Sequence, residues 1–211
     1  FSKRESVYSE NHGDDLFCFL LFSRATLAMI TQLELQIDIL HCHDWHTAPA
    51  GVFLKEAQES GDTAYENICS VLTLHNTAYQ GIQHTEYGET NWLYRGIQAA
   101  YKVTTVSPTY AEEIQQAGHG LEGLLSERAQ AEDLLGILNG IDTDLFDPSR
   151  DSFIRKQYGS TTVATGKAAC KADLQKEVDL PLEPNIPLVG IVSRLVEQKG
   201  IDLVIEAIQS W

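Results

Sequence analysis

The sequence has few basic residues and no long apolar run. Its 211 residues include 15 lysines and arginines against 30 aspartates and glutamates, which gives a formal net charge of −15. A protein that neutralises nucleic-acid phosphates or docks on an anionic membrane needs a basic face, and no cluster of lysine and arginine is present. The longest apolar stretch begins at Leu16 and is far shorter than the roughly 18–20 residues that cross a bilayer. We therefore expect neither a nucleic-acid partner nor a membrane span.

Cysteine is also scarce, and its spacing excludes the common metal and redox motifs. The four cysteines are Cys18, Cys42, Cys69 and Cys170, and no two of them form a Cys-x-x-Cys pair. Cys42 and Cys69 lie in apolar runs that are typical of buried strands. We therefore interpret them as buried, reduced thiols of a protein from a reducing compartment.

Strand-like apolar runs alternate with helical patterns along the chain. Hydrophobic residues make up 43% of the sequence and charged residues 21%, a composition typical of globular proteins. Continuous apolar runs are typical of a parallel sheet covered by helices on both faces, so we predict a Rossmann-like α/β fold. Expected helices are residues 14–35, 47–59, 94–101, 109–117 (with Ser107 as N-cap and Pro108 at the first position) and 201–208, and expected strands are residues 37–43, 68–75, 103–106, 135–138 and 188–193.

Polar side chains follow three of the expected strands at their carboxyl ends. Because ligands of parallel α/β sheets bind at that edge, these groups predict a functional site assembled from several strands. They are His43, Asp44 and His46 after the first strand, His75 and Asn76 after the second, and Asn139 and Gly140 after the fourth.

The histidines of the first strand end also suggest a zinc site. Binuclear zinc hydrolases use the order His-x-His-x-Asp-His, whereas here Asp44 stands one position early and His46 begins the following helix. We therefore expect no metal. We interpret His41 as a hydrogen-bonded core histidine and His46 as a polar contact of the site.

Prolines mark a change of composition after residue 147. Pro148, Pro181, Pro184 and Pro187 fall in this stretch, and a charged segment between them is expected to be helical. We therefore expect one domain over residues 1–147, a connecting region over residues 148–186 and the start of a second domain over residues 187–211.

Two cations follow the last expected strand. Arg194 leaves this strand, and Lys199 with Gly200 opens the next helix, which is expected over residues 201–208. Two cations beside a helix N-terminus form an anion site, and arginine can bind a phosphate through two hydrogen bonds. A separate Gly-x-Gly-x-x-Gly spacing at residues 118–123 follows a helix rather than a strand, so we do not interpret it as a nucleotide-binding loop.

Five stretches in a fixed order resemble the motifs of bacterial glycogen synthases and plant starch synthases, glycosyltransferase family 5. They are residues 38–48, 74–81, 103–111, 136–142 and 193–200. The resemblance covers essentially the whole chain. It implies the GT-B fold, in which two Rossmann-like domains face each other across a cleft. Residues 1–147 would then belong to the acceptor-side domain, and residues 187–211 would begin the nucleotide-sugar domain.

The resemblance also implies an activity and a set of site residues. The family transfers glucose from a nucleotide sugar to the 4-OH at the non-reducing end of an α-1,4-glucan, with retention and without a metal or other cofactor. The implied roles are diphosphate binding by Arg194 and Lys199, contact with the donor glucose by His46, a place in the donor cleft for Asn139, Gly140 and Asp44, and the acceptor side for His75, Asn76, Tyr79 and Gln80.

The expected donor is ADP-glucose rather than UDP-glucose, because bacterial and plastid members of the family use it. The expected compartment is accordingly the bacterial cytoplasm or the plastid stroma. The family's N-terminal Lys-x-Gly-Gly-Leu loop and C-terminal glutamate-rich motif do not occur in the sequence, which begins at Phe1. We therefore interpret the chain as an internal piece of a longer enzyme and expect no transfer by these residues alone.

Two alternatives remain open. A related GT-B transferase of the sucrose or trehalose type is disfavoured by the motifs at residues 79–81 and 139–142. A non-catalytic glucan-binding remnant is suggested by the absent donor loop and by residues 81–91, where the chain is shorter than is usual in the family. Binding to glycogen without turnover would distinguish this remnant from an enzyme.

Overall fold

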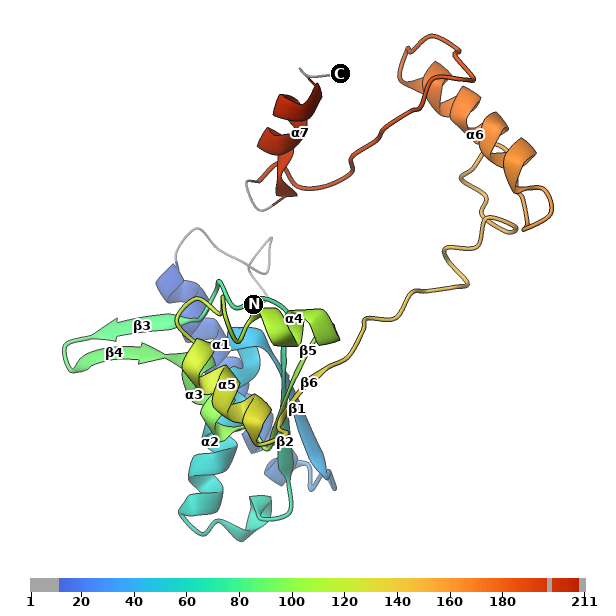
Figure 1. The fold of residues 1–211 in the computed structure, drawn as a ribbon. Coiled ribbons are helices and arrows are strands. Elements are labelled where there is room, and N and C mark those ends of the chain that lie inside the picture. The colour runs from blue at the N-terminus through green and yellow to red at the C-terminus, as the bar shows by residue number, and fades with distance from the viewer. Residues whose placement is uncertain (1–11, 197–198, 209–211) are drawn as a thin grey trace. The chain divides into compact units, whose positions relative to one another are not determined.

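The computed structural model describes residues 12–196 and 199–208 (Figure 1). The chain divides into two compact units, residues 1–140 and residues 141–211.

The first unit is built on a four-stranded parallel sheet with the strand order β1-β2-β5-β6. The strands are β1 (Ile39–His43), β2 (Cys69–Leu74), β5 (Lys102–Thr105) and β6 (Leu134–Gly136). All four correspond to strands predicted from the apolar runs. Because they are parallel, their carboxyl ends lie at one edge of the sheet, where the predicted site residues follow them.

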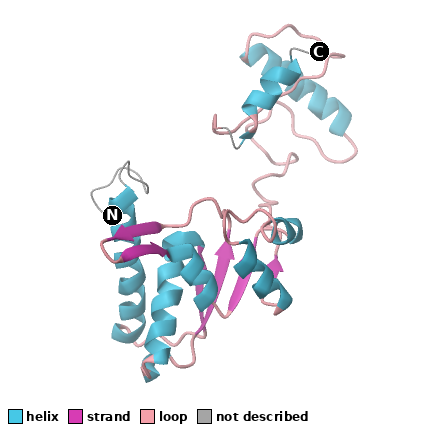
Figure 2. Cartoon of the chain, turned by 60° about the vertical axis from the view of Figure 1, so that its left-hand side comes forward, coloured by secondary structure: helices cyan, strands magenta, loops and turns pink. Residues whose placement is uncertain are grey.

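Helices connect the strands of this unit and bury one face of the sheet (Figure 2). Those between the strands are α2 (Asp44–Glu59), α3 (Trp92–Ala99), α4 (Pro108–Glu113) and α5 (Glu122–Gln130), with a short 3₁₀ turn at Thr63–Tyr65. Helix α1 (His12–Gln32) precedes β1 and packs on α2. Ser107 caps α4 through its hydroxyl, with Pro108 at the first position, as predicted. Leu72, Val103 and Ile97 form part of the fully buried core between sheet and helices.

The other face of the sheet is more exposed than the sequence suggested. Side chains alternate between faces along a strand, so Cys42 is buried whereas His41 is exposed. Cys69, which pairs in register with Ile39, is exposed as well. The expectations of a core His41 and a buried Cys69 are therefore wrong, because both residues lie on the face opposite α2.

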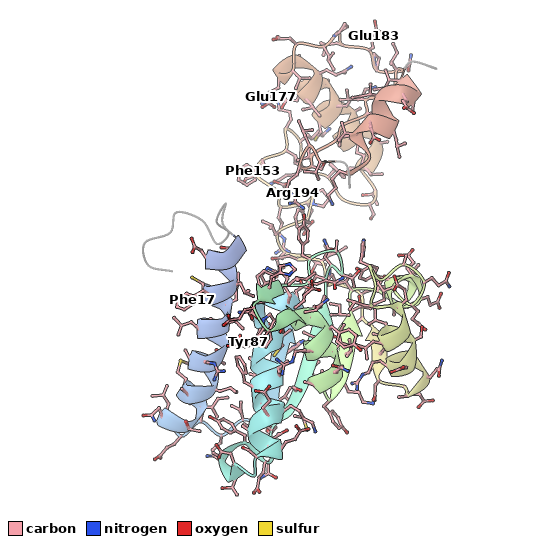
Figure 3. All side chains as sticks on the ribbon, turned by 90° about the vertical axis from the view of Figure 1, so that its left-hand side faces the viewer. Phe17, Tyr87, Phe153, Glu177, Glu183 and Arg194 are labelled. Atoms are coloured by element: carbon pink, nitrogen blue, oxygen red, sulfur yellow. The ribbon has the colours of Figure 1, made fainter. Side chains whose placement is uncertain are left out.

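An antiparallel hairpin was not predicted from the sequence. It consists of β3 (Ile82–Thr85) and β4 (Gly88–Asn91) and occupies the stretch between the second strand and α3. Gly88 takes a φ of +128° in its turn, a conformation that is open to glycine. The hairpin buries little, and Tyr87 in its turn is 92% exposed (Figure 3).

The second unit contains the helices α6 (Val163–Glu177) and α7 (Ile201–Ile208). The strand predicted over residues 188–193 is not formed, and Val189 and Ile191 are 66% and 51% exposed. A strand is stabilised by pairing with a neighbour, and the described residues of this unit include no other strand. Lys171 on α6 instead fixes part of the loop that follows this helix, through hydrogen bonds from Nζ to the carbonyl oxygens of Glu183, Pro184 and Ile186.

No helix in the described part of the chain combines the length and the apolar character of a membrane span.

Candidate functional site

The candidate site begins at the junction between β1 and α2. Asp44, the first residue of α2, has a φ of +52°, which turns the chain sharply from strand to helix. The Thr47 hydroxyl fixes this turn, because it accepts a hydrogen bond from the His43 N–H at 2.6 Å and donates one to the His43 carbonyl oxygen at 2.9 Å. The turn therefore presents His43, Asp44 and His46 at the carboxyl edge of the sheet.

Asp44 links this turn to the end of the neighbouring strand. Its Oδ1 atom accepts hydrogen bonds from the backbone N–H of His75 at 2.7 Å and of Asn76 at 3.3 Å. The structure thus brings together three site residues that were predicted from two separate strand ends. In the structure the Asp44 carboxylate binds backbone N–H groups, a role that the sequence pattern did not suggest.

The side chains of His43 and His75 meet directly. Nδ1 of His43 lies 3.0 Å from Nε2 of His75, so one ring donates a hydrogen bond to the other. The His41 ring packs against that of His43, with a distance of 4.3 Å between the ring centroids. Burial and, secondarily, the neighbouring rings of His41 and His75 lower the pKa of His43. The neutral imidazole is therefore favoured near pH 7.

His46 is held in an aromatic setting. Its ring centroid lies 4.4 Å from that of the buried Trp45 and 4.8 Å from that of Phe19 on α1. Burial lowers the pKa of His46, although the charges of Asp44 and Asp15 oppose this shift. A neutral imidazole at this edge can exchange hydrogen bonds with a sugar hydroxyl.

The loop after β2 carries the predicted acceptor-side residues. Asn76 stabilises it by accepting the Ala78 N–H at 2.9 Å, whereas the Tyr79 side chain is 67% exposed. Gln80 donates to the carbonyl oxygens of Thr77 and His119 and accepts from the Asn91 side chain. Its amide therefore ties the loop together.

Sequence reasoning missed three residues of this region. They are Thr77, Tyr110 and His119, and the buried Thr77 donates its N–H to the Tyr110 hydroxyl at 3.2 Å. Its own hydroxyl lies 3.0 Å from Nδ1 of His119, which has a φ of +57°. The glycines on both sides of His119 signal the tight turn, but they do not reveal its contact with Thr77.

The remaining predicted residues lie elsewhere. Asn139 and Gly140 follow β6 within the first unit and are exposed. Arg194 and Lys199 belong to the second unit and are both exposed, and Figure 3 labels Arg194. Arg194 does not leave a strand as predicted, because the strand is not formed.

The donor atoms of the described residues do not form a metal centre. In residues 12–196 and 199–208, no group of three or more histidine, cysteine, aspartate or glutamate side chains has an arrangement that could hold a metal ion. His43 contacts the rings of His41 and His75, and Nε2 of His41 lies 2.7 Å from the Thr73 hydroxyl.

Comparison with known proteins gives this architecture a family. Residues 1–127 match the sequence profile of the starch synthase catalytic domain. Glycogen synthase 2 of Geobacter sulfurreducens is 39% identical over 230 aligned residues, which cover 98% of this chain and 47% of that protein. Glycogen synthase of Anaeromyxobacter dehalogenans is 40% identical over 232 aligned residues, with 99% and 48% covered.

A solved structure shows the same fold. The catalytic domain of starch synthase IV from Arabidopsis thaliana, bound to ADP and acarbose, matches with a TM-score of 0.82 and 34% identity, covering 98% of this chain and 46% of that chain. Fold and likeness together define an α/β protein of the GT-B fold class. The chain belongs to the family of starch synthase catalytic domains, and its relatives include glycogen synthases. It spans about half the length of the curated relatives it matches.

Proposed function

We propose that the full-length gene product transfers glucose from ADP-glucose to the 4-OH at the non-reducing end of an α-1,4-glucan, with retention. The observation that carries the proposal is the assembly of His43, Asp44 and His46 with His75 and Asn76 at the carboxyl edge of a parallel sheet. Ligands of such sheets bind at this edge. The names of the relatives, glycogen synthase and starch synthase, support the reaction.

In this proposal the first unit binds glucose and glucan. His46, whose neutral form is favoured by burial, contacts hydroxyls of the donor glucose. Asn139 and Gly140 border the donor, and the exposed Tyr79 offers its ring to the acceptor glucan. His75 and Asn76 shape the acceptor side, with Gln80 holding their loop in place.

The second unit supplies the cations. Arg194 and Lys199 bind the diphosphate of the donor and stabilise the negative charge that develops on it as the glycosidic bond breaks. Such electrostatic stabilisation is commonly the largest single contribution of an enzyme to rate. Both residues are exposed, which leaves them accessible to an anion. The proposed reaction uses neither a metal nor another cofactor.

ADP-glucose is the proposed donor because the starch synthase IV structure, to which this chain is similar, was solved with ADP bound. The proposed compartment is the bacterial cytoplasm or the plastid stroma. The four free cysteines agree with a reducing compartment of this kind.

The test is transfer of labelled glucose to glycogen by the full-length gene product, with ADP-glucose and UDP-glucose compared at equal concentration. We expect incorporation from both or from ADP-glucose alone, with kcat/KM at least about tenfold higher for ADP-glucose, a difference of about 1.4 kcal/mol. Binding to glycogen without incorporation from either donor would contradict the proposal and favour a glucan-binding remnant.

A further inference from the structure

Asp44 has an unusual backbone for its place in the fold. It is the first residue of α2 and directly follows β1, yet its φ is +52°. A residue with a Cβ atom rarely adopts this conformation, although aspartate, asparagine and glycine tolerate it better than others. The chain therefore accepts an unfavourable backbone angle at this point, and the contacts of the side chain offer a reason.

The Asp44 side chain reaches across to the next strand. Its Oδ1 atom receives the N–H groups of both His75 and Asn76, at 2.7 and 3.3 Å. These amides lie just beyond β2, where the strand pairing with β1 has ended at Thr73. Hydrogen bonds to an ionised carboxylate are stronger than those between neutral groups. The carboxylate thus continues the connection between the two strands beyond the last paired residue.

This connection fixes where the His75 ring lies. With its backbone N–H held by Asp44, His75 places Nε2 3.0 Å from Nδ1 of His43. Asn76, held by the same oxygen, accepts the Ala78 N–H and so begins the loop that leads to Tyr79 and Gln80. One carboxylate therefore sets the positions of two site residues on the neighbouring strand end.

We propose that Asp44 is a positioning residue, which holds His75 and Asn76 against the β1–α2 turn rather than contacting the sugar donor. This assignment differs from the donor-cleft role implied by the motif. The connection itself stands on the geometry alone, whereas its consequence for glucosyl transfer rests on the proposed function.

Three substitutions separate the effect of the positive φ at residue 44 from the effect of its carboxylate. Asp44→Asn keeps tolerance of a positive φ and an oxygen acceptor, Asp44→Gly keeps only the tolerance, and Asp44→Ala keeps neither. Asp62→Ala is a matched control, because Asp62 also accepts a backbone N–H through its carboxylate, that of Ala64 beyond the far end of α2.

Hydrogen exchange of the His75 and Asn76 amides in the 211-residue chain gives a readout that does not require activity. We expect Asp44→Gly and Asp44→Ala to accelerate exchange at both amides at least about tenfold, Asp44→Asn to retain most of the protection, and Asp62→Ala to have no effect there. Far-UV circular dichroism identifies any variant that fails to fold. If Asp44→Ala does not fold, the exchange rates of Asp44→Gly decide the question. Unchanged protection in a folded Asp44→Gly variant would overturn the proposal.

Kinetics of the full-length gene product then distinguish positioning from donor contact. We expect Asp44→Gly to lower kcat at least about tenfold while KM for ADP-glucose changes less than about threefold, and Asp44→Asn to recover a large part of kcat. A rise in KM for ADP-glucose that is equal in the asparagine and glycine variants would overturn the proposal, because it would show a direct contact of the charge with the donor. Absence of transfer by the wild type would refute the proposed function instead, and the exchange result would still decide the role of Asp44.

Discussion

Among single residues, the two cysteines of neighbouring strands show how the face of a sheet sets reactivity. Cys42 on β1 is buried, and burial raises the pKa of its thiol to about 11, against a smaller opposing effect of its hydrogen bond with Gly51. Cys69 at the start of β2 is exposed. Because the thiolate is the reactive form, Cys42 is both shielded and protonated at neutral pH.

We expect alkylation of the native chain with iodoacetamide at about pH 8 to modify Cys69 at least tenfold faster than Cys42, with mass spectrometry of peptides as the readout. Unfolding in denaturant should make both cysteines react at similar rates. Equal rates in the native chain would contradict the assignment of Cys42 to the buried face.

The site histidines make stability depend on pH. The pKa of His46 lies below its ordinary value of 6.5, so protonation favours the unfolded chain. The free energy of unfolding should therefore be highest above about pH 6.5 and should decrease as the pH falls below that value. We expect the loss between about pH 7.5 and 5.5, measured from urea unfolding, to be smaller in His46→Gln. An equal loss in variant and wild type would contradict the shift.

The residues of the site could be predicted more easily than their contacts. Strand ends alone indicated that His43, Asp44, His75 and Asn76 converge, because parallel strands end at one edge of a sheet. The pattern could not show that the Asp44 carboxylate binds backbone amides, since this depends on its φ of +52°. Gln80 gave no signal for its bond to His119, which lies 39 positions away.

At the scale of elements, prediction worked where apolar residues are periodic or continuous. The four strands of the parallel sheet and helices α1 to α4 were all expected, with ends that differ by a few residues. Helix α5 was missed, since it buries little besides Leu125 and is rich in polar residues. The hairpin β3–β4 was missed because its side chains are mostly exposed and show no apolar alternation. Residues 188–193 are apolar but have no described strand beside them.

The junction between the loop after β2 and helix α2 depends on one glycine. Gly81 has a φ of +63°, and a Cβ atom added there would lie 2.3 Å from the ring of the buried Trp45. Gly81→Ala should therefore lower the free energy of unfolding by about 1–3 kcal/mol, measured by urea unfolding.

Gly61→Ala is the matched control for this substitution. Gly61 also has a positive φ, +84°, but a Cβ atom there would meet nothing within 4 Å. Gly61→Ala should therefore be destabilised only by the unfavourable backbone angle, and it should lower the free energy of unfolding less than Gly81→Ala. Equal effects of the two substitutions would show that the contact with Trp45 does not matter.

At the scale of the molecule, the two units differ in how much of their backbone is hydrogen bonded. The first unit has a parallel sheet with a buried core, whereas residues 178–196 of the second form neither helix nor strand. Proteases cut where the backbone opens easily. We expect brief trypsin treatment of the chain to cut first after Arg194 or within residues 150–156, as mapped by mass spectrometry. A first cut within residues 39–136 would contradict this difference between the units.

In the proposed function, glucosyl transfer takes place at the carboxyl edge of the sheet. The most direct test is the initial rate of glucose transfer from ADP-glucose to glycogen by the full-length gene product and two histidine variants. His46→Ala changes the site, whereas His84→Ala changes an exposed histidine of the hairpin, paired with Glu89 at 3.4 Å. With both variants folded, we predict a loss of at least about tenfold in kcat for His46→Ala, because a hydrogen bond to the donor glucose is lost, and a rate within about twofold of the wild type for His84→Ala. Equal rates in all three proteins would contradict the proposal.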